Sequence, residues 1–301
     1  MKVDAICSAQ AELGEGPFWV PKDQALWFVD IAGRSIHRYQ LVSEQHTVWT
    51  TPDRVSFVIP ISGCGSLVAL GRAMHHFDAL SGEFRHVASV EPHLADNRIN
   101  DACVSPQGEL WFGSMHDLET DASGTLYRLD REGRITALDH GYVISNGPAF
   151  SPNGRIFYHT DTYRRVIYAF DYGADGQLSN KRILVQLEES AGFPDGTSVD
   201  AEGCLWIALW GGWGVRRYSP TGALLETLRL PCANVTKLTF GGTDYRTAFV
   251  TTAWRGLSAT ERSAQPTAGD LFTFRSEVPG LAPVELELRE SRKGHSVDSD
   301  I

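Results

Sequence analysis

The segment LWFVDI at residues 26–31 is followed by IHRY at 36–39, and this pairing of short apolar segments recurs along the chain. Each later pair again places aromatic or aliphatic residues at alternate positions, and glycine-containing turns such as 130–133 separate the pairs. Alternation of this kind predicts short antiparallel strands rather than helices. The first segments of the six pairs begin at Leu26, Leu67, Leu110, Ile156, Leu205 and Ala248.

The spacing of these six positions is regular, at 41, 43, 46, 49 and 43 residues. Units of about 45 residues that each form a small antiparallel sheet are typical of a β-propeller, whereas a β-sandwich would show such spacing only by accident. We therefore predict an all-β fold, a six-bladed β-propeller. Residues 1–284 are expected to form a single domain and 285–301 a polar C-terminal tail. The first residues should complete the final blade, in which 258–269 is a longer insert.

Composition narrows the possible partners and compartments of the protein. The chain has 301 residues, and its formal net charge of −10 without a Lys/Arg cluster argues against nucleic acid and anionic lipid. No apolar run of about 18 residues predicts a membrane span, and the N-terminal residues lack the apolar core of a secretory signal. The five cysteines are scattered and form no CxxC pair, which favours reduced thiols. We expect a cytoplasmic protein that is a monomer or a weak homo-oligomer.

The same register predicts where a functional site lies. In a propeller the innermost strands run along the central channel, so that equivalent positions from all blades converge at its mouth. Each of these channel positions lies 10 or 11 residues before one of the six repeat starts named above, and each opens a strand-like segment. The six residues found there are all polar: Glu15, Ser56, Asn100, Asn146, Asp195 and Lys237.

Three members of this ring are candidate ligands for a divalent cation. Glu15, Asn146 and Asp195 supply two carboxylates and an amide, and oxygen donors of this kind suit a hard or borderline ion. Each is followed directly by glycine, which would let the backbone approach an ion closely. Turn entries favour Asn and Asp for conformational reasons alone, which is the alternative interpretation of any single position. We predict a metal site at the mouth of the central channel.

Other polar residues cluster near this ring in the sequence. The segment NRIND at 97–101 carries Arg98, a charged donor that could bind substrate or simply neutralise acidic neighbours. The segment MHDLE at 115–119 follows a predicted strand, and its side chains could bind a ligand or be solvated loop residues. Three tryptophans are candidate walls of a sugar pocket; we expect Trp206 to lie in the core and Trp210 and Trp213 to line the pocket.

Motifs for other chemistries are absent from the sequence. There is no GxSxG, HExxH, P-loop or GxGxxG unit in a strand–helix context. The triplet His159-Thr160-Asp161 has no matching nucleophile, so a serine triad is not expected.

Several ordered motifs resemble those of the regucalcin/gluconolactonase family, from about residue 11 to 275. They are LGEGP at 13–17, NRIND at 97–101, WFGSMH at 111–116, ISNGPAFSPNG at 144–154, FYHTDT at 157–162 and FPDGTSVDAEG at 193–203. The stretches FYHTDTYRRVIYAFD, LSNKRILVQ and LWIALWGGWG most resemble the bacterial xylonolactonases of that family. The chain departs from the family pattern at Ser114, where threonine is more usual, and at Ala102, where animal members carry glycine.

The resemblance implies a six-bladed propeller with one divalent metal ion at the channel mouth. It implies that Glu15, Asn146 and Asp195 are the metal ligands, in agreement with the repeat register. It further implies that Arg98, Asn100 and Glu119 bind the substrate. The ion could be Ca²⁺, Mg²⁺, Mn²⁺, Zn²⁺ or Fe²⁺.

The implied activity is that of a metal-dependent sugar lactonase, which hydrolyses an aldonolactone to the aldonic acid. Asp195 would act as the catalytic base toward water. The small-molecule substrate expected from the resemblance is D-xylonolactone or another pentonolactone, with gluconolactone as a slower one. An organophosphate or aryl-ester hydrolase of related propeller type and a non-catalytic metal-binding propeller are the alternatives.

Overall fold

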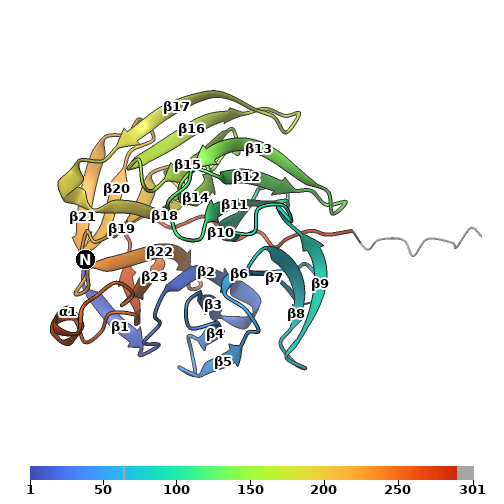
Figure 1. Ribbon diagram of the computed structural model, residues 1–301. Coiled ribbons are helices and arrows are strands. Elements are labelled where there is room, and N and C mark those ends of the chain that lie inside the picture. The colour runs from blue at the N-terminus through green and yellow to red at the C-terminus, as the bar shows by residue number, and fades with distance from the viewer. Residues whose placement is uncertain (64, 290–301) are drawn as a thin grey trace, which may run out of the picture.

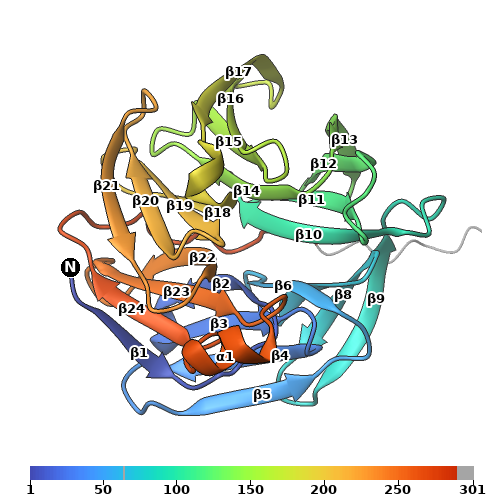
Figure 2. The same cartoon turned by 60° about the vertical axis from the view of Figure 1, so that its left-hand side comes forward.

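The computed structural model describes residues 1–63 and 65–289. Six four-stranded sheets surround a central channel, and every strand pair recorded within them is antiparallel (Figure 1 and Figure 2). The innermost strand of each sheet contacts the innermost strands of the two neighbouring sheets. The protein is therefore a six-bladed β-propeller, as the repeat spacing predicts.

The blades follow one another along the chain, and their strands run from the channel outward. Blade 1 contains β2 (Gly14–Val20), β3 (Ala25–Asp30), β4 (Ser35–Gln40) and β5 (His46–Thr50), with the 3₁₀ helix η1 (Pro21–Asp23) after β2. Blade 2 contains β6 (Val55–Pro60), β7 (Ser66–Leu70), β8 (Ala73–Asp78) and β9 (Glu83–Ser89). Blade 3 contains β10 (Asn97–Val104), β11 (Leu110–His116), β12 (Gly124–Leu129) and β13 (Ile135–Tyr142).

The second half of the ring is built in the same way. Blade 4 contains β14 (Ser145–Phe150), β15 (Ile156–Asp161), β16 (Val166–Tyr172) and β17 (Leu178–Gln186). Blade 5 contains β18 (Phe193–Val199), β19 (Leu205–Trp210), β20 (Gly214–Tyr218) and β21 (Leu224–Arg229), and is preceded by the 3₁₀ helix η2 (Glu189–Ala191). Blade 6 contains β22 (Asn234–Gly241), β23 (Thr247–Ala253), β24 (Leu271–Arg275) and β1 (Val3–Cys7).

The ring is closed by strands from opposite ends of the chain. β1 pairs with β24 in an antiparallel register that sets Val3 opposite Phe274. The predicted role of the first residues is thus confirmed. The predicted insert contains a short helix, α1 (Ala259–Ala264), which begins with a capping box between Ser258 and Glu261.

The hydrophobic core lies between adjacent blades. Phe57 and Leu67 of blade 2 pack in one cluster with Ile99 and Phe112 of blade 3. Between blades 1 and 6, Trp19 stacks on Phe249 with ring centroids 5.2 Å apart. An aromatic pair of this kind contributes about 0.5–1.5 kcal/mol beyond its buried area. The interlocking clusters hold the innermost strands at fixed positions around the channel.

Every innermost strand carries a register irregularity against the second strand of its blade. In β2 it lies between Glu15 and Phe18, and in β14 between Asn146 and Ala149. The other four fall at equivalent places in β6, β10, β18 and β22. Because a bulge re-aims side chains, it turns the polar ring positions toward the channel.

The segment after β24 crosses one end of the channel. Gly280 N–H donates to Tyr245 O of blade 6, and Leu286 N–H donates to Pro60 O of blade 2. Leu286 is fully buried in the cluster between blades 2 and 3. Residues 285–289, assigned to a polar tail from their composition, are therefore held against the propeller by the side chains of Leu286 and Leu288 and by backbone hydrogen bonds. The rest of that tail lies outside the described residues, as does Cys64.

The described part of the chain contains no helix with the length and apolar character needed to cross a bilayer. Cys7, Cys103, Cys204 and Cys232 are free thiols, as predicted for these four.

Candidate functional site

A cavity of about 440 Å³ opens at one mouth of the channel. All six residues predicted as metal ligands or substrate contacts line it: Glu15, Arg98, Asn100, Glu119, Asn146 and Asp195. Further lining residues come from the ends of the second strands and the loops that follow them, among them Asp117, Thr162, Trp210 and Arg255. The fold thus brings together in one cavity six predicted residues that lie up to 180 positions apart in the sequence.

The glycines beside the candidate ligands have a conformational role. Gly16 and Gly147 adopt positive φ values of 55° and 52° within the bulges of β2 and β14. A left-handed residue at the bulge lets Glu15 and Asn146 face the channel. Gly196 differs, because a Cβ there would lie 2.4 Å from Cγ of Lys237. The contact with Lys237 therefore explains why residue 196 is glycine, and the approach of an ion is not needed to explain it.

A chain of hydrogen bonds fixes the amide side chains. Arg98 Nη1 donates to Asn100 Oδ1 at 2.5 Å, and Asn100 Nδ2 donates to Asn146 Oδ1 at 2.9 Å. Asn146 Nδ2 donates in turn to Thr162 Oγ1 at 3.0 Å. This order points the carbonyl oxygen of Asn146 away from Thr162, and that oxygen keeps a second lone pair for a ligand.

Arg98 is held from the opposite side by a loop carboxylate. Its Nε lies 3.2 Å from Asp117 Oδ1. Asp117 also accepts two hydrogen bonds of 2.6 Å from Arg54, which precedes β6. A guanidinium bonded in this way has one orientation, and because only 8% of Arg98 is exposed its free N–H groups are confined to the cavity.

The carboxylates of Glu15 and Asp195 are buried, with exposures of 6% and 7%. Burial and the nearby charge of Asp101 raise the pKa of Glu15 from 4.5 to about 8. Burial and the charge of Glu15 raise the pKa of Asp195 well above its usual value. Burial, together with these neighbouring charges, thus disfavours ionisation of both carboxylates unless a positive charge lies nearby.

This donor set fits a divalent cation. The carboxylate of Asp195 accepts no hydrogen bond from residues 1–63 and 65–289, so its oxygens are available to a ligand, and Glu15 accepts only from Gly16 N–H at 2.7 Å. A cation would neutralise the repulsion that raises both pKa values. Within those same residues no three His, Cys, Asp or Glu side chains are grouped to hold a metal ion. The third member of this set is an amide, Asn146.

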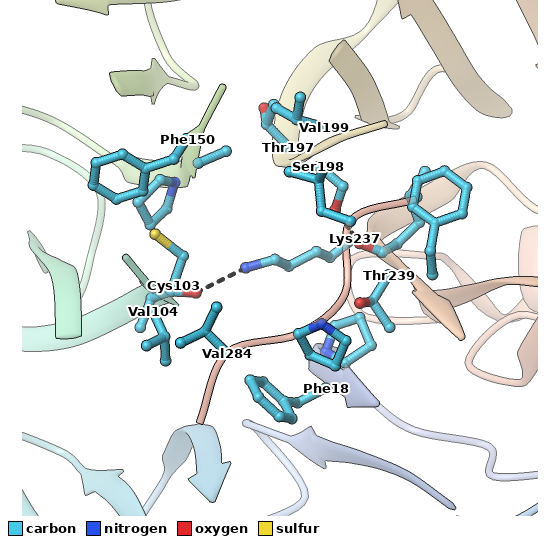
Figure 3. Close-up of a pocket in the computed structure, with 18 of the residues that line it drawn as sticks. Phe18, Cys103, Val104, Phe150, Thr197, Ser198, Val199, Lys237, Thr239 and Val284 are labelled. Atoms are coloured by element: carbon cyan, nitrogen blue, oxygen red, sulfur yellow. Dashed lines mark hydrogen bonds between the residues drawn. The ribbon is translucent and has the colours of Figure 1, made fainter. Parts of the chain in front are cut away.

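Two ring positions do not line the cavity. Ser56 donates from Oγ to Ile99 O at 2.6 Å and joins the inner strands of blades 2 and 3. Lys237 extends into a second cavity of about 340 Å³ at the other end of the channel. Figure 3 shows its side chain directed toward the strand that carries Cys103 and Val104. Polar character at a ring position therefore does not by itself identify a residue of the site.

The tryptophan candidates separate in the structure. Trp206 is 1% exposed and donates from its indole N–H to Asp200, as expected for a core residue. Trp210 lines the site cavity. Trp213 and His116 are not among the residues that line it. Trp213 lies in the β19–β20 turn with a positive φ of 60°.

Sequence reasoning missed one buried serine–histidine contact. Ser145 Oγ lies 2.9 Å from His159 Nε2, and both residues are fully buried. Neither lines the site cavity, so a substrate cannot reach the pair. Several lining residues were also not singled out, among them Thr162, Tyr163, Phe193 and Arg255. Thr162 and Tyr163 directly follow β15, and that position in the repeat could have indicated them.

Comparison with known proteins places the chain in a family. The sequence profile of the "SMP-30/Gluconolactonase/LRE-like region" matches residues 13–254. A regucalcin from Danio rerio is 34% identical over 288 residues, which are 94% of this chain and 97% of that protein. A 6-deoxy-6-sulfogluconolactonase from Pseudomonas putida is 33% identical over 272 residues, which are 90% of this chain and 93% of that protein.

A solved structure agrees with these relatives. The crystal structure of a calcium-binding protein, regucalcin, from Agrobacterium tumefaciens superposes with a TM-score of 0.89 at 29% identity, covering 95% of this chain and 96% of that one. The resemblance carried by the motifs at 13–17, 97–101 and 193–203 is thereby confirmed. The chain belongs to the SMP-30/gluconolactonase/LRE-like family.

Proposed function

We propose that the protein is a metal-dependent sugar lactonase that hydrolyses an aldonolactone to the aldonic acid. The observation that carries this proposal is the single cavity in which Glu15, Asn146 and Asp195 meet Arg98 and Asn100. A lactonase among the relatives, the 6-deoxy-6-sulfogluconolactonase, supports the reaction class. The cavity volume of about 440 Å³ is within the range of small-molecule sites.

Glu15, Asn146 and Asp195 would hold the cation, which when bound supplies a Lewis acid that polarises the lactone carbonyl. Their oxygen donors favour Ca²⁺, Mg²⁺ or Mn²⁺, and Zn²⁺ or Fe²⁺ remain candidates by family resemblance. The calcium-binding description of the Agrobacterium relative supports a divalent ion.

Asp195 is the proposed base. Its carboxylate accepts no hydrogen bond from the described residues, so it can take a proton from a water molecule in the cavity. That water adds to the carbonyl carbon, and the bond from this carbon to the ring oxygen then breaks. Asp195 returns the proton to the ring oxygen, which becomes the hydroxyl group of the open acid.

The remaining residues orient the sugar ring. Arg98 is fixed by Asn100 and Asp117 and presents its free N–H groups to the cavity. Glu119 is an exposed lining residue whose carboxylate can accept hydrogen bonds from sugar hydroxyl groups. Groups fixed before binding lower the entropic cost of reaching the reactive geometry.

For the substrate we propose a pentonolactone, with D-xylonolactone first and L-arabinonolactone second. The sequence likeness of residues 158–171 and 205–214 to xylonolactonases supports this choice. One additional exocyclic carbon changes binding only modestly, so gluconolactone should be hydrolysed about tenfold less efficiently. The cytoplasmic location and the monomeric or weakly oligomeric state stay predictions.

The test combines substrates, cations and variants. kcat/KM is measured for xylono-, arabinono-, glucono- and galactonolactone and for a phosphotriester and an aryl ester, after chelation and reconstitution with each ion. Asp195→Asn should lower lactonase kcat/KM at least about a hundredfold. Asp4→Asn, an exposed change on β1, is the control and should have no effect.

Each outcome has a defined meaning. Full activity of chelated protein would refute the metal-dependent mechanism, and near-normal turnover by Asp195→Asn would remove that residue from catalysis. A preference for the phosphotriester would refute the lactonase assignment. A preference for a hexonolactone would refute only the pentose assignment.

A further inference from the structure

An ion pair crosses the channel beneath the candidate metal site. Lys237 lies on β22 of blade 6, and its Nζ contacts Oδ1 of Asp101 on β10 of blade 3, the opposite blade of the ring. The same Nζ donates to Ala102 O at 3.1 Å. Lys237 and Asp101 are 7% and 3% exposed, so the pair is buried. Figure 3 shows the lysine side chain extending across the second cavity toward blade 3.

The surroundings of the pair are arranged to accommodate it. Asp101 accepts hydrogen bonds from the backbone N–H groups of Ala102, at 2.7 Å, and Gly147, at 3.0 Å. The lysine stem lies against Gly196, where a Cβ would be 2.4 Å from Lys237 Cγ and 2.5 Å from its Cβ. These contacts tie the pair to the residues directly after Asn146 and Asp195, the two candidate ligands on β14 and β18.

The buried charges around the site can be counted. Glu15, Asp101 and Asp195 are three carboxylates, and Lys237 is one ammonium group, which leaves a formal charge of −2 when all are ionised. The other charges near the cavity are paired: the buried Arg98 and the nearby Arg54 contact Asp117, and Arg255 contacts Glu12. Because two arginines share Asp117, one positive charge remains, and the exposed Glu119 carboxylate balances it.

We propose that Lys237 compensates the third buried carboxylate, Asp101, and so keeps the charge of the metal site at −2, which favours a divalent over a trivalent cation. This inference rests on the proposed function, because it requires that Glu15, Asn146 and Asp195 bind a metal ion. A charge of −2 is neutralised by a single divalent ion, whereas a charge of −3 would favour a trivalent ion. Charges buried in a site of low dielectric interact strongly, so one unit changes cation affinity markedly.

The residues involved act by position and charge. Lys237 and Asp101 do not line the cavity of the site, so they are positioning residues and not catalytic ones. The lysine takes the place of a second positive ion near the three carboxylates. It also separates the cavity of the site from the second cavity, which it lines together with Cys103 and Thr197.

The test uses three variants of the full-length protein. Asp101→Asn leaves a charge of −1 and should weaken Ca²⁺ binding about tenfold or more. Lys237→Met leaves −3 and should raise the affinity for Tb³⁺ relative to Ca²⁺ by about tenfold or more. The double variant Asp101→Asn/Lys237→Met restores −2 without an unpaired buried charge, and should return both affinities close to those of the unmodified protein.

Binding is followed by calorimetry for Ca²⁺ and by Tb³⁺ luminescence sensitised through Trp210, which lines the cavity. Circular dichroism checks that each variant is folded. If one single variant does not fold, the other decides alone, since each has its own expected direction. Loss of Tb³⁺ and Ca²⁺ binding in Glu15→Gln locates the bound ion at the proposed site.

Failure of this inference differs from failure of the proposed function. Absence of stoichiometric cation binding in the unmodified protein would overturn the metal site itself. Binding that Asp101→Asn leaves unchanged, or an unaltered Tb³⁺/Ca²⁺ ratio in Lys237→Met, would overturn only the role of the ion pair. A double variant as weak as Asp101→Asn would show that the aspartate acts by structure and not by charge.

Discussion

The buried carboxylate of Glu15 should destabilise the protein whenever no cation is bound. Glu15 is 6% exposed and accepts one hydrogen bond, from Gly16 N–H. Burial, followed by the charge of Asp101, raises its pKa from 4.5 to about 8. Glu15→Gln removes this charge and keeps the size of the side chain. We therefore expect the variant to be more stable than the unmodified protein after chelation.

The magnitude follows from proton linkage. Between pH 4.5 and pH 8 the folded state binds a proton at Glu15 that the unfolded state has released. Stability contributed by that proton is complete below pH 4.5 and is lost as pH rises, by about 1.4 kcal/mol per pH unit. At pH 7 the loss is about 3 kcal/mol, which is a large share of a typical stability of about 5–15 kcal/mol. The variant lacks this loss.

The assay is urea denaturation of chelated protein at pH 5, 6, 7 and 8. The stability difference in favour of Glu15→Gln should be below about 1 kcal/mol at pH 5 and should grow by about 2–3 kcal/mol by pH 7. Glu83→Gln, an exposed change on β9, is the control and should run parallel to the unmodified protein. Parallel pH profiles for Glu15→Gln and the unmodified protein would refute the reasoning.

Addition of a cation should reverse the order. A ligand present at one thousand times its Kd stabilises the folded state by about 4.1 kcal/mol, which exceeds the difference of about 3 kcal/mol at pH 7, and only the unmodified protein keeps both carboxylates for it. A gain of equal size in Glu15→Gln would show that the ion binds elsewhere.

Three further substitutions test separate parts of the structure. Arg98→Lys should lower lactonase kcat/KM about a hundredfold, because the fixed guanidinium is lost, and should leave the free energy of unfolding unchanged. Unchanged kinetics would exclude Arg98 from the site. Gly147→Ala should destabilise by about 2–5 kcal/mol in urea, since φ is +52° and the new Cβ would meet two threonine oxygens at 2.6 Å. Gly133→Ala, with positive φ but open space, should cost only about 1–2 kcal/mol. Leu286→Ala should lower the free energy of unfolding by about 2–5 kcal/mol because its segment is anchored, whereas Leu80→Ala, an exposed change, should leave that free energy almost unchanged.

The architecture could be predicted from sequence because the repeat is expressed in the second strand of each blade. Leu110, Ile156 and Leu205 begin β11, β15 and β19, and the other three marks fall one residue inside β3, β7 and β23. Positions 10 or 11 residues before these marks lie in the innermost strands, since the connection between the first two strands of each blade has nearly constant length. All six ring positions lie in innermost strands and are buried.

Which ring residues line the cavity, and which form other contacts, could not be predicted in this way. Asn100 and Asp101 are consecutive, so strict alternation would send one of them away from the channel. The bulge between Ile99 and Ala102 lets both reach it. The contact of Asp101 with Lys237 joins residues 136 positions apart, and only the closed ring brings them together. The path of the chain after β24 likewise depends on a few apolar residues that pack against the blades, namely Leu281, Leu286 and Leu288.

The pairing of β1 with β24 has a consequence for synthesis on the ribosome. Cys7 and Leu271, partners in that sheet, are 264 residues apart. At about 5–20 residues per second, roughly 13–53 s pass between their synthesis. During that interval β1 has no partner strand, and blade 6 cannot be completed. Ring closure therefore waits until β24 has been synthesised, and a chaperone that holds extended segments would find Val3–Cys7 exposed until then.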